Sequence, residues 1–405
     1  MITIQGVTTI DGTVSDVSLP SEEQRSIAGS GLTLLPALID PHVHFRTPGL
    51  EYKENWETGA RAAIYGGITT VFDMPNTIPP TITLERIEEK EALIRQQLIK
   101  ANIPLHFGLY LGADKAHFNQ IPRCKGKIVG IKIFMGSSTG DLVMDDDDSL
   151  HAAFTLAAAH DLLIAVHAED EALIHKRTTQ FRGVSDPQVH SQIRNDEVAF
   201  LATQKAIALS RLHKTRLYIL HVGTRREIEL ISQAKKEGVQ VFVETTPHHL
   251  FLTIDDYARL GTKVQMNPPL RTQTDLAALW KAINEGVIDT IGSDHAPHTL
   301  EEKTRPYGQA PSGIPGVETT LPLLLDACNQ GRITLRQIVR LMRERILDIF
   351  HLPSNDDFIL VDMKKKATVD ERRLKTRCGW SPYAGKVLQG WPVYTILQGK
   401  VYELR

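Results

Sequence analysis

The segment Leu35-Pro-Ala-Leu-Ile-Asp-Pro-His-Val43 is the first of a series of short apolar runs that decides the fold of this chain. Each run is followed by a longer stretch with helical periodicity, and the alternation continues to residue 345. We interpret the apolar, β-branched runs as strands at residues 35–43, 69–74, 105–110, 128–134, 162–167, 216–221, 240–245 and 289–294. Helical patterns between them include residues 55–65, 84–100, 148–160, 193–212, 225–236 and 275–284.

Eight strands that alternate with helices indicate parallel βαβ units, and eight is the number that closes a barrel. The alternative, an open doubly wound sheet, would usually carry a glycine-rich phosphate loop after its first strand. Neither GxGxxG nor GxxxxGKS occurs in the sequence. The expected fold class is therefore α/β, with a (β/α)8 TIM-like barrel.

The two ends of the chain differ from the middle, because residues 1–36 and the stretch after residue 352 hold only short alternating runs. Neither set is large enough for a core of its own, so we expect the two to pair in one small β-sandwich. The expected domains are residues 1–36 and 347–405, which share the sandwich, and residues 37–346, which form the barrel.

The composition argues against several classes of protein. With 46 basic and 48 acidic residues the formal charge is -2, so nothing draws the chain to nucleic acid or to a membrane surface. No run of about 18 apolar residues and no signal-peptide pattern occurs, so we expect no membrane span. The three cysteines lie far apart without CxxC spacing, which argues against disulfides and favours a reducing cytoplasm.

The candidate chemistry begins with His42 and His44 at the end of the first strand. Residues i and i+2 of a strand point the same way, so both imidazoles can meet one metal ion. His167, His221 and Asp294 end the fifth, sixth and eighth predicted strands. Because the carboxyl ends of barrel strands converge on one mouth, we expect these five side chains to form a metal site.

Lys132 lies inside an apolar predicted strand, where an unpaired ammonium group is costly to bury. One interpretation pairs it with a buried carboxylate, for which Asp294 is the candidate. The other is a lysine that has reacted with CO2, because a carbamate has two oxygens that can bridge two metal ions about 3.5–4 Å apart. The residues alone leave both interpretations open.

Five motifs together resemble the signature set of the dihydroorotases, a family within the amidohydrolase superfamily. They are Asp40-Pro-His-Val-His-Phe-Arg-Thr-Pro-Gly49, Asp73-Met-Pro-Asn-Thr77, Glu244-Thr-Thr-Pro-His-His-Leu250, Met266-Asn-Pro-Pro-Leu-Arg271 and Gly292-Ser-Asp-His-Ala-Pro-His298. The resemblance covers nearly the whole chain, through Cys378-Gly-Trp-Ser-Pro-Tyr383.

The resemblance implies a binuclear site with two zinc ions. In that arrangement His42 and His44 hold one ion, and Asp294 completes the ligand set of this first ion. His167 and His221 hold the other ion, and carboxylated Lys132 and a hydroxide bridge the two. Some dihydroorotases lack the lysine and use an aspartate near this point, which makes Asp141 the fallback ligand.

Arg46 lies two residues beyond His44, so we expect it at the same mouth, where a planar guanidinium suits a substrate carboxylate. The alternative is a structural arginine that binds loop carbonyls. The resemblance implies that Arg46, Asn76 and His298 bind the carboxylate of dihydroorotate, a small-molecule substrate, and that Asn267 contacts its ring.

The implied reaction is reversible hydrolysis of dihydroorotate to N-carbamoyl-aspartate in pyrimidine biosynthesis, with Asp294 as the catalytic group that moves the proton. Hydantoinases, dihydropyrimidinases and allantoinases are the alternatives on the same fold, and their substrates lack this carboxylate. A non-catalytic scaffold for aspartate transcarbamoylase is a further alternative, although every ligand position is filled here. A homodimer is expected from base rates, and contact with aspartate transcarbamoylase cannot be read from the sequence.

Other polar residues near the motifs are expected to support the site rather than act in it: His248, His249, His295, Glu169 and Asp73. We interpret His248 and His249 as strand residues that face opposite ways. Residues 299–317 are too irregular for a helix, and we expect them to form part of the substrate wall.

Overall fold

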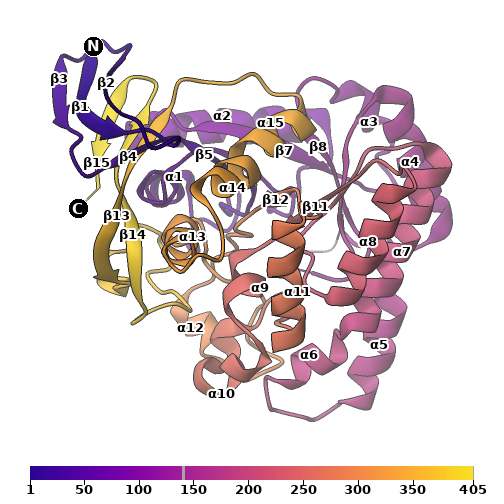
Figure 1. Ribbon diagram of the computed structural model, residues 1–405. Coiled ribbons are helices and arrows are strands. Elements are labelled where there is room, and N and C mark those ends of the chain that lie inside the picture. The colour runs from indigo at the N-terminus through magenta and orange to yellow at the C-terminus, as the bar shows by residue number, and fades with distance from the viewer. Residues whose placement is uncertain (139–141, 405) are drawn as a thin grey trace.

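The centre of the molecule is a barrel of parallel strands, shown in Figure 1 as a computed structural model that describes residues 1–138 and 142–404. Eight strands form one sheet in the order β12-β11-β10-β9-β8-β7-β6-β5. They are β5 (Leu38–Val43), β6 (Ile68–Asp73), β7 (His106–Gly112), β8 (Gly130–Phe134), β9 (Ile164–His167), β10 (Leu217–Ile219), β11 (Val241–Thr245) and β12 (Thr290–Ile291). A parallel bridge between Val43 and His295 closes the barrel, which confirms the predicted fold.

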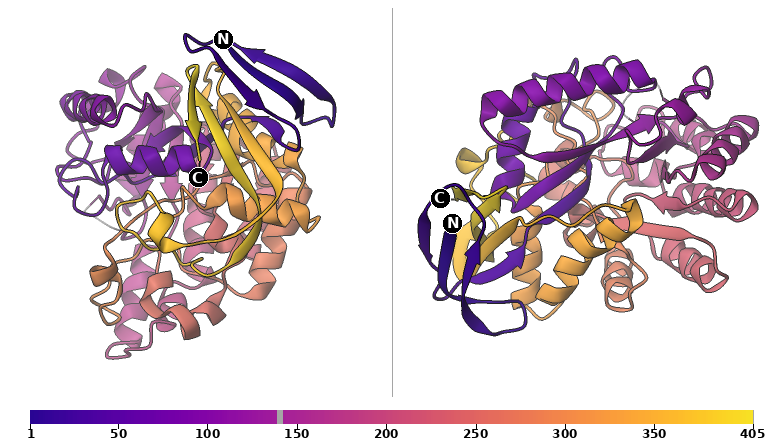
Figure 2. Two further views of the ribbon diagram at one scale, coloured as in Figure 1. Left: turned by 90° about the vertical axis from the view of Figure 1, so that its left-hand side faces the viewer. Right: turned by 90° about the horizontal axis from the view of Figure 1, so that it is seen from above.

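Helices surround the strands on the outside of the barrel (Figure 2). The longer ones are α1 (Trp56–Tyr65), α2 (Leu84–Ala101), α4 (Asp147–His160), α5 (Glu171–Gln180), α7 (Asp196–His213), α8 (Arg225–Lys236), α11 (Gln273–Asn284) and α13 (Thr320–Asn329). The shorter ones are α3 (Gln120–Arg123), α6 (Val189–Ile193), α9 (Pro247–Phe251), α10 (Tyr257–Leu260), α12 (Leu300–Lys303), α14 (Leu335–Val339) and α15 (Arg345–Phe350). All six predicted helical stretches are present.

Helix starts are encoded locally by capping residues. Asn55 accepts a hydrogen bond from the backbone N–H of Thr58 at the start of α1, and Thr224 and Glu227 form a reciprocal capping box at the start of α8. Another box, between Thr299 and Glu302, starts the single turn α12. The prediction that residues 299–317 contain no helix is therefore wrong for that turn, whose capping signal is confined to four residues.

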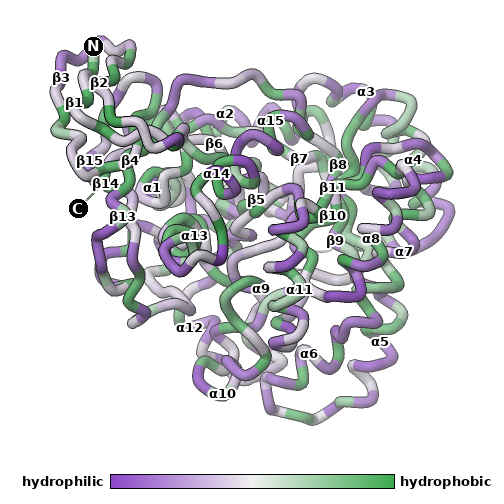
Figure 3. Tube along the Cα trace, viewed as in Figure 1, coloured by the Kyte–Doolittle hydropathy of each residue, from purple (hydrophilic) through white to green (hydrophobic). Residues whose placement is uncertain are grey.

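Two apolar layers hold the barrel together. The larger layer lies between strands and helices, and Figure 3 shows hydrophobic colour along the central strands and hydrophilic stretches on outer helices such as α7. The second layer fills the barrel interior at the amino ends of the strands, where Phe350 of α15 packs edge-on against Phe72, Tyr110 and Tyr218. Because α15 plugs this end, the opposite mouth is left for a site.

The chain ends pair in a seven-stranded sheet beside the barrel, and both termini lie there (Figures 1 and 2). The strands are β1 (Ile2–Thr8), β2 (Val14–Leu19), β3 (Arg25–Ala28), β4 (Thr33–Pro36), β13 (Phe358–Thr368), β14 (Val387–Leu397) and β15 (Lys400–Glu403). The antiparallel pair of β4 with β13 joins the N-terminal strands to the C-terminal strands, and Ile4, Leu34, Leu360 and Ile396 belong to their shared apolar core. This pairing confirms the predicted sandwich of the two ends.

Within the described residues, none of the helices has the length and apolar character that crossing a membrane requires.

Candidate active site

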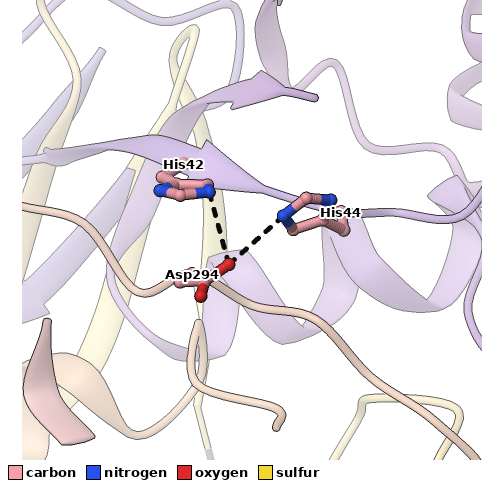
Figure 4. A group of neighbouring side chains, drawn as sticks. All are labelled: His42, His44 and Asp294. Atoms are coloured by element: carbon pink, nitrogen blue, oxygen red, sulfur yellow. Dashed lines mark ion pairs between the residues drawn. The ribbon is translucent and has the colours of Figure 1, made fainter. Parts of the chain in front are cut away.

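Three predicted metal ligands meet at the carboxyl end of the barrel (Figure 4). Asp294 Oδ1 lies 3.3 Å from His42 Nε2 and 3.2 Å from His44 Nε2. The histidines come from β5 and the residue just after it, whereas Asp294 follows β12. The ligand atoms of the three residues all lie within 4.8 Å of one another, which is a suitable arrangement for one ion.

The second predicted pair lies beside the first. His167, the last residue of β9, and His221, two residues after β10, face each other with His167 Nδ1 3.0 Å from His221 Nε2. The ring of His221 is also 5.4 Å from the ring of His42, centroid to centroid. The structure therefore brings all four histidines and Asp294 together, although 252 positions separate His42 from Asp294.

Acidic and amide side chains orient these imidazoles from behind. His42 Nδ1 donates to Glu244 Oε1 at 2.7 Å, and His44 Nδ1 donates to Asn76 Oδ1 at 2.8 Å. In each ring the outer nitrogen then carries the proton, so Nε2 presents its lone pair to the site. Carboxylate partners that fix the tautomer in this way are typical of histidines that bind metal ions.

His167 has the same kind of support from Glu169. His167 Nε2 donates to Glu169 Oε2 at 2.9 Å, and Arg194 makes a short ion pair with the same oxygen. Although burial raises the pKa of Glu169, Arg194 and His167 hold it down at about 2, so the carboxylate stays ionised. Glu169 is thus in the supporting position that the sequence predicted for it.

Burial keeps the imidazoles neutral. It lowers the pKa of His42 to about 3 and the pKa values of His44 and His221 well below their ordinary value. Neutral imidazoles are the form that binds zinc. Four neutral imidazoles and one carboxylate, oriented from outside, are therefore a donor set that fits divalent metal ions.

Lys132 lies on β8 beneath these ligands and is almost completely buried. Its Nζ lies 4.6 Å from the centre of the Phe134 ring, and within the described residues no carboxylate pairs with it. Asp294 thus attracts the amine through its charge, but the two side chains form no direct ion pair of the kind that the first interpretation expected. Burial lowers the pKa of the amine to about 7, against the opposing charges of Asp294 and Glu244. A neutral amine is the form that reacts with CO2.

The fallback ligand Asp141 lies outside the described residues.

A cavity joins the metal ligands to most of the predicted substrate residues. The predicted residues that line it are His42, His44, Arg46, Asn76, Lys132, His167, His221, Asn267 and Asp294. The remaining lining residues, which were not named as site residues from the sequence, are Phe134, Ser138, Ala296, Ser312 and Gly313. Ser312 and Gly313 belong to the segment predicted as substrate wall.

His298 is the one predicted site residue that is not among the described lining residues. It lies behind Arg46, with Nε2 3.2 Å from Arg46 Nη2 and 3.0 Å from Ser312 O. Arg46 is also almost completely buried, and its Nε donates to Pro297 O at 3.0 Å. Arg46 thus binds a loop carbonyl, as the interpretation of a structural arginine expected, but it also lines the cavity.

Three site residues have left-handed backbone, which side chains other than glycine rarely adopt. The φ angles are +63° at Arg46, +41° at His221 and +45° at Asp294. Each such position costs of the order of 1–3 kcal/mol and persists where the surrounding structure enforces it. All three follow the carboxyl ends of strands, so the strained turns occur where the chain presents these side chains to the mouth.

Two histidines are in a different element from the one expected. His248 and His249 lie in the helix α9, not on a strand, so the argument that they must face opposite ways is wrong. Thr246 and Pro247 supply the cap and first residue of this helix, a signal that the strand interpretation overlooked. His249 binds Thr246 Oγ1 and Pro269 O, which agrees with its expected supporting role.

Asp73 and His295 also lie behind the site. Asp73 accepts from the backbone N–H of Phe45 at 2.7 Å and pairs with buried Lys90 at 2.6 Å. His295 Nε2 lies 3.4 Å from Glu54 Oε2, and its Nδ1 accepts from Gly316 N at 3.1 Å. The two residues thus hold the segments that carry His44 and Asp294, as expected.

A parallel barrel whose mouth gathers histidines, an aspartate and a buried lysine is the architecture of a barrel hydrolase. Residues 33–342 match the Amidohydrolase family, and the chain belongs to this family. Its similar relatives include dihydroorotases. That of Pyrococcus furiosus is 36% identical over 98% of this chain and 89% of the relative, and that of Halobacterium salinarum is 33% identical over 98% and 96%. The resemblance drawn from the motifs is confirmed.

The similar solved structures include enzymes that are named for other ring substrates. An L-hydantoinase (dihydropyrimidinase) from Arthrobacter aurescens superposes with a TM-score of 0.91 at 30% identity, over 99% of this chain and 95% of that one. A dihydropyrimidinase from Brevibacillus agri gives 0.89 at 25% identity, over 98% and 94%. Fold similarity is thus shared with enzymes that carry the names of other activities, so the choice of substrate depends on the site residues.

Proposed function

We propose that this amidohydrolase is a dihydroorotase, which interconverts dihydroorotate and N-carbamoyl-aspartate in pyrimidine biosynthesis. The observation that carries the proposal is the buried guanidinium of Arg46, which faces the same cavity as the candidate metal ligands. A cationic fork at this point suits a ring substrate that bears a carboxylate. The relatives named dihydroorotase, similar over nearly the whole chain, support the same choice.

The proposed cofactors are two zinc ions. His42, His44 and Asp294 would hold one, His167 and His221 the other, and Lys132, as its carbamate, would bridge them. When bound, the metal ions supply a hydroxide nucleophile near neutral pH and a Lewis acid for the ring carbonyl. The outward hydrogen bonds of His42 and His44 support this assignment, because they leave Nε2 free for coordination.

Asp294 is the proposed catalytic residue that moves the proton. Its Oδ1 lies nearest to His42 and His44, so the other carboxylate oxygen is available to accept a proton from the nucleophile. The same carboxyl group then delivers this proton to the ring nitrogen as the amide bond breaks. In ring closure the proton moves in the reverse direction.

The remaining substrate contacts come from the walls of the cavity. Arg46 binds the ring carboxylate, Asn76 and His298 assist it, and Asn267 contacts the ring. Arg46 is held in place by Pro297 O and His298, which restricts the orientations of the guanidinium before substrate binds.

The second candidate function is that of a hydantoinase or dihydropyrimidinase, favoured by the solved structure that superposes with a TM-score of 0.91. The two functions differ in the charge of the ring substrate. The purified protein, loaded with zinc, should open dihydroorotate with a kcat/KM at least tenfold above its values for hydantoin, dihydrouracil and allantoin. Faster turnover of any neutral ring would assign the chain to the second candidate.

The bridge has its own test. Metal analysis of protein prepared with and without bicarbonate should give two metal ions per chain only when bicarbonate is present. One ion per chain in both preparations would remove Lys132 from the metal site. Cytoplasmic location, a homodimer, and domain limits at residues 36/37 and 346/347 remain part of the proposal.

A further inference from the structure

Behind the cavity, three cationic side chains gather around the imidazole of His298. Lys53 Nζ lies 2.9 Å from His298 Nδ1, and Arg46 Nη2 lies 3.2 Å from His298 Nε2. Lys303, which is completely buried, donates to Gln265 O and Pro311 O at 2.8 Å each. Lys303 therefore joins the segments before Asn267 and Ser312, which both line the cavity.

Basic side chains outnumber acidic ones in this cluster. Glu302 Oε1 pairs with Lys53 Nζ at 3.0 Å, but within residues 1–138 and 142–404 neither Arg46 nor Lys303 forms an ion pair with a carboxylate. The carboxylates of Asp294, Asp73 and Glu302 attract Arg46 only from beyond ion-pair distance. An anionic ligand in the adjoining cavity could contact the buried guanidinium directly and offset the cost of burying it. The charge distribution therefore favours an anionic substrate at this end of the cavity.

Lys53 also determines how His298 is protonated. An ammonium group has only donors, so its contact with Nδ1 requires a lone pair on that nitrogen. Burial and the charges of Arg46, Lys53 and Lys303 hold the pKa of His298 well below its usual value, so the ring is neutral. The single ring proton then lies on Nε2 and is donated to Ser312 O at 3.0 Å. Arg46 Nη2, which is itself only a donor, therefore packs 3.2 Å from that nitrogen without a hydrogen bond to it.

We propose that Lys53 is a positioning residue for the substrate carboxylate: through His298 it holds Arg46 and Ser312 in place at the cavity wall, and with Arg46 it supplies positive charge at this end of the cavity. The inference rests on the proposed dihydroorotase function, and it explains why a histidine behind Arg46 contributes to recognition. A neutral ring would gain nothing from this arrangement.

The test compares zinc-loaded wild type with Lys53→Met, Lys53→Arg and the control Lys127→Met. Lys127 forms an exposed ion pair with Glu88 and is not part of the buried cluster around His298. The readouts are KM and kcat for dihydroorotate, and the Kd of orotate, a planar ring with the same carboxylate. Lys53→Met should raise KM and Kd about tenfold each and lower kcat less than threefold. Lys53→Arg, which keeps the charge and a donor, should recover most of the loss.

Three results would overturn the inference, and the first two are KM and Kd of Lys53→Met within twofold of wild type, or a loss confined to kcat. A purely structural role predicts a lower melting temperature and equal losses in Lys53→Met and Lys53→Arg, which would also overturn it. If wild type itself fails to turn over dihydroorotate, the proposed function fails. If wild type is active and Lys53→Met behaves like it, only the inference fails.

Discussion

Replacement of Arg46 by methionine removes the guanidinium that we assign to the substrate carboxylate. Methionine has a similar unbranched length, and both residues carry a Cβ, so the left-handed backbone at this position, with φ at +63°, is equally strained in each. The contacts to Pro297 O and His298 are lost as well, but His298 keeps its bonds to Ser312 O and Trp380 Nε1. The substitution therefore isolates the guanidinium better than a change to glycine or alanine.

The expected magnitude follows from the hydrogen bonds at stake. A carboxylate bound by a guanidinium fork makes two charge-assisted bonds, each worth about 1.5–3 kcal/mol. Their loss costs about 3–6 kcal/mol, and because 1.4 kcal/mol corresponds to a factor of ten, KM should rise by about 10²–10⁴. Since the carboxylate lies away from the reacting carbonyl, kcat should fall much less.

Steady-state kinetics with dihydroorotate measures both constants, and Arg95→Met, at an exposed arginine paired with Glu91, is the matched control. A KM for Arg46→Met within threefold of wild type would refute the carboxylate assignment. It would leave Arg46 as a structural arginine that binds loop carbonyls.

Three further substitutions address the proton carrier, the orientation of a ligand and the stability of the site. Asp294→Asn should lower turnover in both directions by about 10²–10⁴, measured on protein of known metal content, because the amide cannot accept the proton. Glu244→Gln should weaken metal binding by about 10–100-fold in competition with a chelator, since the carboxylate orients His42 at 2.7 Å. Lys90→Met should destabilise the fold by about 3–5 kcal/mol in denaturant unfolding, because it leaves the carboxylate of Asp73 buried without its cation at 2.6 Å.

Each of these substitutions has a result that would contradict its reasoning. Activity of Asp294→Asn near that of wild type would assign proton transfer to another group. Unchanged zinc affinity in Glu244→Gln would mean that His42 is oriented by its strand alone. For Lys90, the double variant with Asp73→Asn should recover part of the lost stability, and no recovery would show that the loss comes from packing.

Much of the barrel and its ligands could be predicted because the information is local. A buried strand reads as a short apolar run, and His42, His44 and His167 lie on or next to such runs. The barrel topology then brings strand ends together wherever they are in the sequence. The positions of His221 and Asp294 followed from the same rule.

The parts that could not be predicted depend on contacts between distant segments. Glu54 accepts from the backbone N–H of Arg377 at 3.1 Å, and Trp380 Nε1 donates to His298 O at 2.8 Å, contacts that no local pattern indicates. The charge cluster of Lys53 and Lys303 likewise exists only once α12 packs beside the mouth. The helix at His248 was missed for another reason, because five residues are too few for a periodic signal.

The central claim is that this chain interconverts dihydroorotate and N-carbamoyl-aspartate, and ring closure tests it most directly. The zinc-loaded protein should convert N-carbamoyl-aspartate to dihydroorotate and reach the same equilibrium ratio as a reaction started from dihydroorotate. Absence of ring closure by protein that opens hydantoin or dihydrouracil under the same conditions would contradict the claim.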